Sequence, residues 1–150
     1  MDLEKVIRDY LPLIQHMSLG TSHDNKPWVC EVHFAYDDDL NLYFRSKPDS
    51  RHSEEIALNS NVAGDIVRTH ALDEYPLGIY FEGNAIKLND DVAIKKAYPY
   101  FQKILKSDES ILENAAQPDG HKFYKITVSN WYVFGKFGNE AGKKYNLKWN

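Results

Sequence analysis

The chain has 150 residues, of which 43% are hydrophobic and 27% are charged, and its formal net charge is -4. This length predicts a single domain over residues 1–150 with a substantial hydrophobic core. The acidic balance argues against a dedicated nucleic-acid-binding protein, and no apolar run is long enough to span a membrane. The single cysteine and an amino terminus unlike a signal peptide predict a cytoplasmic protein without internal disulfides.

The first half of the chain predicts a helix followed mostly by strands. Apolar residues at helical spacing, an N-cap at Asp2 and a break at Pro12 define the helix. Alternating side chains from Trp28 to Tyr36 predict a strand, which we join to the next strand as a β-hairpin across an acidic turn. The elements expected here are a helix ending near residue 10 or 11, strands over 16–22, 28–36 and 40–45, and a helix over 50–58.

The second half predicts further strands and two helical segments. Gly83, inside a long strand pattern, indicates a bulge or a close approach by another group. Pro99 is expected to kink or divide the helix that contains it. The elements expected here are strands over 62–67 and 77–88, a helix over 90–106, a helical patch around 111–115, strands over 122–128 and 131–134, and a lysine-rich tail. The whole pattern predicts a mainly β (α+β) fold, an antiparallel Greek-key barrel with peripheral short helices.

The segment 45–52 carries the clearest chemistry, because a strand ends there and a helix begins at Ser50. A helix start offers unpaired N–H groups and the positive end of the helix dipole, which together favour an anion. Arg51 lies in the first turn, where a cation is disfavoured unless an anion binds beside it. The neighbours that would help to hold a phosphate dianion are Arg45, Ser46, Lys47 and His52. The alternative is a solvated basic turn, paired with Glu54 or Glu55.

Other residue types point away from familiar catalytic sites. The six histidines are scattered without the spacing of metal ligands, so no metal site is predicted. The chain has no Gly-x-Ser-x-Gly elbow and no glycine-rich nucleotide loop. Cys30 lies on the apolar face of its strand, which is typical of a small buried hydrophobe rather than a nucleophile. The residues alone therefore assign no catalytic group.

The order of elements and several short motifs resemble the pyridoxamine 5'-phosphate oxidase-like, FMN-binding split-barrel superfamily, especially a small bacterial branch of it. The motifs are Pro27-Trp28-Val29-Cys30-Glu31-Val32, Leu42-Tyr43-Phe44, Ser50-Arg51-His52, Asn61-Val62-Ala63-Gly64, Phe81-Glu82-Gly83-Asn84-Ala85, Phe134-Gly135 and Leu147-Lys148-Trp149. The likeness covers nearly the whole chain and implies an antiparallel split β-barrel.

The resemblance also implies an FMN site between the two subunits of a homodimer. Ser50, Arg51 and His52 would hold the FMN phosphate, although His52 stands where the family often has Lys. An imidazole makes that contact strongly only when it is protonated. The other positions that match the family's FMN site are Cys30, Glu31, Val32 and His33 along the isoalloxazine ring, Phe44 and Arg45 along the ribityl-phosphate path, and Trp131 from the second subunit.

Two departures from the family pattern bear on the activity. The authentic oxidase usually has an Arg at the place of Cys30 and a Lys at the place of Ala35, which argues against pyridoxamine phosphate oxidation here. We expect an FMN-dependent oxidoreductase that acts on another small substrate or electron acceptor. The alternatives are a non-catalytic flavin- or haem-binding protein or sensor and, disfavoured by charge, a barrel that binds single-stranded oligonucleotides. Neither nucleic acid nor a membrane is an expected partner.

Overall fold

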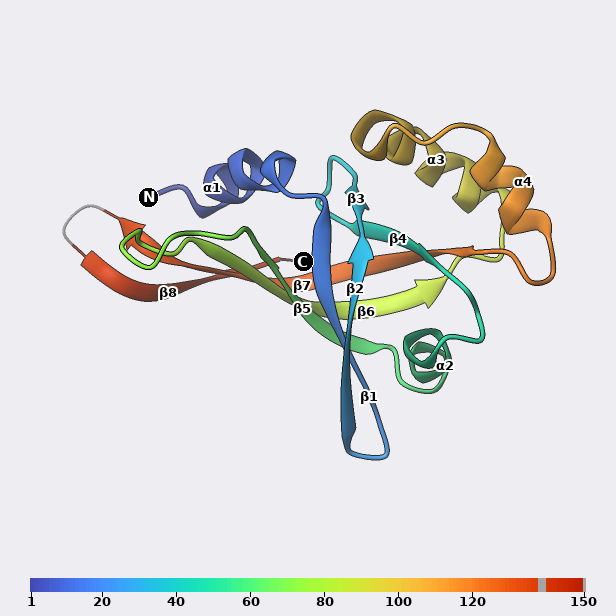
Figure 1. The fold of residues 1–150 in the computed structure, drawn as a ribbon, viewed down its shortest axis with the longest axis horizontal. Helices are drawn as coiled ribbons and strands as arrows, with labels where there is room; N and C mark the ends of the chain where they lie inside the picture. Colours follow the sequence, from blue (N-terminus) through green and yellow to red (C-terminus); the bar gives the residue numbers. More distant parts are fainter. Residues whose placement is uncertain (138–139, 150) are drawn as a thin grey trace.

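The computed structural model describes residues 1–137 and 140–149, and their framework is one eight-stranded sheet (Figure 1). The strand order is β2-β1-β5-β6-β7-β4-β3, with β8 paired to β7, and the paired strands run antiparallel. The strands are β1 (His16–His23), β2 (Lys26–His33), β3 (Ala35–Tyr36), β4 (Leu42–Ser46), β5 (Asn61–Val67), β6 (Gly78–Lys87), β7 (Lys122–Phe137) and β8 (Glu140–Lys148). The predicted mainly β, antiparallel split-barrel fold is confirmed.

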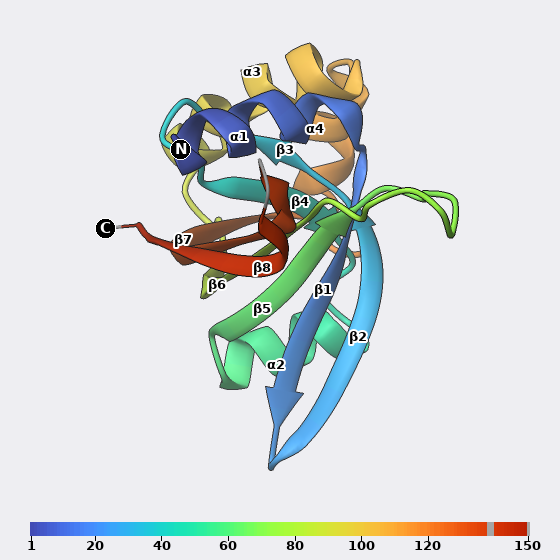
Figure 2. The ribbon, with the colours of Figure 1, turned by 90° about the vertical axis from the view of Figure 1, so that its left-hand side faces the viewer.

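The helices lie around the sheet, with α1, α3 and α4 on one side and α2 on the other (Figures 1 and 2). They are α1 (Leu3–Tyr10), extended by a short 3-10 turn (Leu11–Leu13), α2 (Arg51–Leu58), α3 (Asp91–Leu105) and α4 (Ser110–Ala116). The predicted N-cap of α1 is confirmed, because the Asp2 side chain accepts a hydrogen bond from the Lys5 N–H. Within the described residues, no helix combines the length and apolarity needed to cross a membrane.

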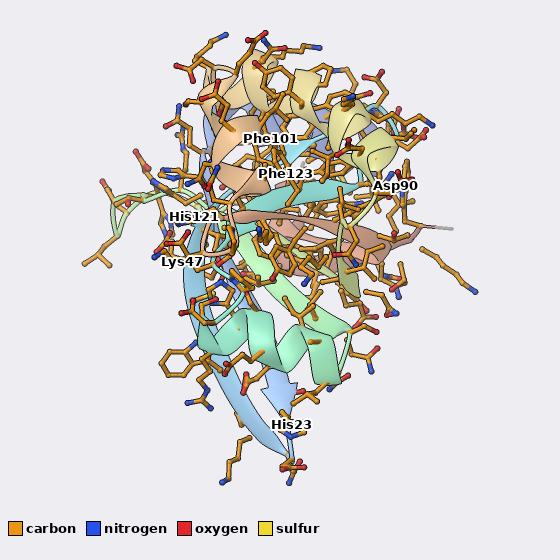
Figure 3. All side chains as sticks on the ribbon, turned by 90° about the vertical axis from the view of Figure 1, so that its right-hand side faces the viewer. His23, Lys47, Asp90, Phe101, His121 and Phe123 are labelled. Carbon is orange, nitrogen blue, oxygen red and sulfur yellow. The ribbon has the colours of Figure 1, made fainter. Side chains whose placement is uncertain are left out.

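Two groups of buried side chains hold these layers together. The larger fills the barrel and includes Phe44, whose ring stacks on that of Tyr124 with centroids 4.9 Å apart. The smaller lies under α3, where Phe101 and Phe123 meet edge to face with centroids 5.1 Å apart (Figure 3). This second cluster fixes α3 on β7 and so positions the helical side of the cavity described below.

β2 pairs with β1 along its whole length, from His33 opposite His16 to Lys26 opposite His23. The two-residue turn between them has positive φ at Asp24 and Asn25, a conformation that these residue types tolerate better than most. The predicted hairpin between 28–36 and 40–45 is therefore wrong over most of its length, since only β3 pairs with β4. Side-chain alternation identifies a strand, but it does not identify the partner of that strand.

The predicted strands over 122–128 and 131–134 are one continuous strand, β7, and the predicted tail forms β8 against it. The polar pair Ser129 and Asn130 suggested a break, but it lies opposite the bulge between Glu82 and Gly83. There the Ser129 hydroxyl donates to the Glu82 carbonyl, and the Asn130 amide donates to the Glu82 carboxylate. The predicted bulge is confirmed, because a Cβ at Gly83 would lie 2.2 Å from a backbone oxygen of β7.

The helix around Pro99 is not divided. α3 continues as one helix from Asp91 to Leu105, with Pro99 inside it, so of the two predicted alternatives division is wrong, and a kink stays a prediction. The helix ends at Lys106, which adopts the left-handed conformation and donates its N–H to the carbonyls of Gln102 and Phe101. The end of α3 and the first turn of α2 both contribute residues to the cavity described below.

Candidate functional site

A cavity of about 530 Å³ opens where β2 and β4 meet the start of α2 and the end of α3. The lining residues predicted from the sequence are Glu31, Val32, His33, Arg45, Ser46 and His52. The lining residues that the sequence did not single out are Gln15, Phe101, Leu105, Ser107 and His121. The fold thus brings the basic segment and the predicted ring-lining segment of β2 to one cavity.

One end of this cavity carries positive charge from Arg45 and Lys47, at the end of β4, close to the imidazole of His121, the residue before β7. The ladder pairs Arg45 with Phe123 and Ser46 with Lys122, so Lys47 and His121 follow side by side where the pairing ends (Figure 3). Desolvation lowers the pKa of His121, and the charges of Arg45 and Lys47 lower that pKa further. Because the charges of Arg45 and Lys47 both act on His121, an anion bound close to His121 would be stabilised by both charges.

The Arg45 guanidinium is half-buried and oriented by its neighbours. Its Nη2 donates to the side-chain oxygen of Asn114 at 2.8 Å, and its Cζ lies 5.5 Å from the centroid of the Phe123 ring. Its Nε is buried and has no hydrogen-bond partner among the described residues. Burial lowers the pKa of Arg45, yet an arginine stays charged at neutral pH. A half-buried cation that lines a cavity fits an anionic ligand.

Beside this cationic end, hydroxyl groups and an imidazole cluster at the start of α2. The Ser46 Oγ lies 2.5 Å from His52 Nε2 and 3.2 Å from the Ser50 Oγ. Burial lowers the pKa of His52, and the nearby Glu55 carboxylate partly opposes that shift. Ser50 is the N-cap of α2, but its side chain makes no capping hydrogen bond to the helix. The first-turn N–H groups are therefore without that partner, as an anion site requires.

Arg51 lies outside the cavity lining. Its guanidinium stands over the Trp28 indole, with Cζ 4.3 Å from the ring centroid, and its Nε donates to Glu55 at 3.3 Å. Glu55 is buried and also accepts a 2.8 Å hydrogen bond from Thr21. Arg51 therefore pairs with Glu55, as the alternative of a basic turn paired with an acidic residue predicts, while a contact between Arg51 and the FMN phosphate stays a prediction.

The other predicted residues lie beside or beneath the cavity. Phe44 is fully buried, so its side chain supports β4 and offers no surface to a ribityl chain. Trp131 is also fully buried, with its ring 5.9 Å from that of Phe81, so it cannot pack on a flavin in a second subunit. Burial raises the pKa of the Cys30 thiol to about 11, which keeps it a neutral, hydrophobe-like side chain. Lys47 contributes charge at the cavity's edge rather than lining its wall.

A pair of histidines stands at the opposite end of the cavity. His33 lies directly across the β1–β2 ladder from His16, and their ring centroids are 4.8 Å apart. The Nδ1 of His16 is 3.9 Å from a carboxylate oxygen of Glu31, and both side chains are more than half exposed. Across residues 1–137 and 140–149, no group of three or more histidine, cysteine or acidic residues is arranged to hold a metal ion.

Comparison with known proteins identifies the architecture. The sequence matches no family model and no curated protein sequence. The structure is similar to a haem-binding protein from Mycobacterium smegmatis, with a TM-score of 0.77 at 13% identity, over 99% of this chain but only 58% of that one. It is similar to an FAD-binding protein from Mesorhizobium loti, with a TM-score of 0.66 at 21% identity, covering 87% of this chain and 91% of that one.

A third similar structure is that of a candidate pyridoxamine 5'-phosphate oxidase from Listeria innocua. Its TM-score is 0.64 at 20% identity, and the match covers 88% of this chain and 98% of that one. Similarity at this level of identity establishes the fold. The chain therefore has the fold of the pyridoxamine 5'-phosphate oxidase-like split-barrel proteins, as its sequence motifs predict.

Proposed function

We propose that this protein is a flavoprotein that binds FMN in the cavity between β2, β4, α2 and α3, and that it is an oxidoreductase acting on a small molecule. The observation that carries this proposal is the cationic end of the cavity. There Arg45, Ser46, His52 and His121 line the cavity, and the charges of Arg45 and Lys47 both act at His121. A phosphate dianion would supply the negative charge that pairs with this group.

The rest of the cavity suits a planar ring. Val32, Phe101 and Leu105 contribute apolar wall, while Glu31 and His33 contribute polar groups along one side. A volume of about 530 Å³ falls within the range usual for cofactor sites. When bound, FMN supplies the electron-transfer chemistry, and the role of the chain is to bind the cofactor, orient it and tune its potential.

The substrate we propose is not a vitamin phosphate. At the two positions where the authentic oxidase usually carries a cation, this chain has half-buried Cys30 and fully buried Ala35. Neither side chain supplies a positive charge, and burial keeps Cys30 in its neutral form by raising its pKa to about 11. The cations that line or border the cavity are assigned above to the cofactor phosphate, so a second phosphate lacks a comparable set of partners.

Haem is the second candidate ligand. The paired, exposed rings of His16 and His33 stand at one end of a partly apolar cavity, and neutral imidazole is a common haem ligand. The similarity to the M. smegmatis haem-binding protein supports the same possibility. FMN remains the first candidate because its phosphate concentrates two negative charges on one group, which suits the compact cluster of Arg45, Lys47 and His121, whereas haem carries its two negative charges on separate propionates.

We further propose that the protein works as a homodimer with the flavin close to the interface. Trp28 and Val29, on the edge strand β2, are 40% and 64% exposed. Large apolar side chains exposed together on a sheet edge favour burial against another surface. A second copy placed there would cover β2 next to the residues that line the cavity.

Native mass spectrometry of the purified protein, followed by titration with FMN, riboflavin and haem, tests these proposals. We expect a dimer that binds one FMN per chain and binds riboflavin, which lacks the phosphate, more weakly. Haem uptake without flavin uptake would favour the second candidate, and uptake of neither would contradict both. Flavin binding without turnover of a reduced nicotinamide, tested with a range of acceptors, would indicate a non-catalytic binder.

A further inference from the structure

The side chain of Asn114 joins two of the residues that line the cavity. Its Oδ1 accepts one hydrogen bond from Arg45 Nη2 at 2.8 Å and another from the backbone N–H of His121 at 2.9 Å. Asn114 lies on α4, and Arg45 lies on β4, 69 residues away in sequence. A single amide oxygen therefore sets the relative positions of the guanidinium and of the segment that carries His121.

The backbone around Asn114 is held firmly against the start of β7. A Cβ at Gly120 would lie 1.7 Å from the Asn114 carbonyl oxygen, so only glycine permits this approach. Lys122 closes the end of α4 by donating its ammonium hydrogens to the carbonyls of Ala115 and Gln117. Asn114 thus reaches Arg45 from a support that has little freedom to move.

The choice of an amide at this position has a chemical consequence. Asp has nearly the same size and would accept the same two hydrogen bonds, but its negative charge would neutralise Arg45. An amide oxygen orients the guanidinium and leaves its positive charge available to a ligand. A carboxylate at position 114 would instead pair with Arg45 and neutralise its charge within the protein.

We infer that Asn114 is a positioning residue that holds Arg45 oriented and uncompensated for the phosphate of the cofactor. The inference rests on the proposed function and adds a residue on α4 that determines preference for a phosphorylated flavin. Asn114 itself need not touch the flavin, because it acts through Arg45. Its effect should therefore appear in the discrimination between FMN and riboflavin, not in the binding of the ring.

The test compares dissociation constants of FMN and riboflavin for the wild-type protein and Asn114→Asp. We expect the FMN constant to rise about tenfold or more, since an ion pair to the phosphate is lost, while the riboflavin constant stays within about twofold. Asn25→Asp is the matched control, because it makes the same change in the β1–β2 turn, where Asp also tolerates positive φ. That turn lies next to His23, far from His121 (Figure 3).

The possible failures are distinguishable. If wild-type protein prefers FMN and Asn114→Asp keeps the full preference, the inference fails and the proposed function stands. An equal loss of affinity for both flavins in Asn114→Asp would show a merely structural role and would also overturn the inference. Wild-type protein that binds neither flavin overturns the proposed function and this inference together.

Discussion

Arg45 and Arg51 lie six positions apart in one basic segment, but the fold gives them different environments. Arg45 is half-buried at the end of β4, is held by Asn114, and lines the cavity. Arg51 begins α2, is half-exposed, and already has two partners in Trp28 and Glu55. An arginine whose donors and charge are satisfied within the chain has less to offer a ligand than one whose donors are not.

The difference shows that the backbone N–H groups at a helix start and a cationic side chain in the same turn need not face the same ligand. His52, in the first turn of α2, lines the cavity and contacts Ser46, so the start of α2 belongs to the cavity region. The cation of that turn, Arg51, instead stands over the Trp28 ring of β2. The sequence predicts that Arg51 supplies the cation at the start of α2, but Arg45 on β4 supplies it instead. Substitutions of Arg45 and of Arg51 test whether the two arginines differ in this way.

The largest effect is expected from Arg45→Met, which keeps an unbranched apolar stem and removes the charged guanidinium. Losing a charge-assisted hydrogen bond costs about 1.5–3 kcal/mol, so the FMN dissociation constant should rise roughly tenfold to 150-fold. Riboflavin should bind nearly as before, because it has no phosphate. Fluorescence titration with both flavins measures the effect. Arg8→Met, which removes an exposed arginine paired with Glu4 on α1, serves as the control.

The second effect is a pH dependence that only the phosphorylated flavin should show. Desolvation lowers the pKa of His52 and of His121, so both imidazoles are neutral near pH 7 in the absence of an anion. A bound phosphate raises these pKa values, which means that binding takes up protons and that affinity increases as the pH falls.

The FMN dissociation constant should therefore decrease by up to about tenfold per proton taken up between pH 8 and pH 7, while that of riboflavin stays flat. His52→Gln, which keeps a hydrogen-bonding side chain but cannot be protonated, should reduce the slope. A slope of the same size for riboflavin would place the titrating group near the ring instead of the phosphate.

A smaller effect is expected from Arg51→Ala. The half-exposed Arg51 guanidinium pairs with the buried Glu55 carboxylate, which keeps its hydrogen bond from Thr21, and makes a cation–π contact with Trp28. Together the two contacts of Arg51 contribute about 1 kcal/mol to stability. Thermal unfolding should show a modest loss of stability, and the FMN dissociation constant should change by less than about threefold. A loss of FMN affinity as large as that of Arg45→Met would reverse the assignment of the two arginines.

The smallest effect on flavin binding is expected from Trp131→Phe. The side chain is fully buried in its own chain, and its indole Nε1 has no hydrogen-bond partner among the described residues. The substitution leaves an aromatic ring in the core and removes that unsatisfied donor, so stability should change by about 1 kcal/mol or less. Both flavins should bind with unchanged affinity. Altered flavin affinity in folded protein would restore Trp131 to the binding site.

Features that depend on nearby residues were predictable from the sequence. The Asp2 cap, the helix after Ser50 and the Gly83 bulge follow from local hydrogen bonding and steric limits, and the structure contains all three. The partner of β2 and the continuity of β7 were not predictable in this way, because they depend on pairing between strands that are distant in the sequence. A polar pair such as Ser129 and Asn130 looks like a break until the partner atoms of Glu82 are known.

The residues of the site likewise divide into those that the sequence predicts and those that it does not. Local chemistry identified the segment from Arg45 to His52, and the resemblance to split-barrel proteins implied the strand residues Glu31 to His33. The fold brings residues of both to one cavity. Nothing local marks His121 or Asn114, because their importance arises only from contact with Arg45 and its surroundings. The orientation of Arg51 likewise depends on Trp28, which a distant turn places beside α2.

A crystal structure of the protein grown with FMN tests the central claim most directly. We predict flavin in the cavity between β2 and α3, with phosphate oxygens within hydrogen-bonding distance of Arg45 and His52. A phosphate held by Arg51 beside Trp28, or a cavity left without flavin at saturating FMN, would contradict the account.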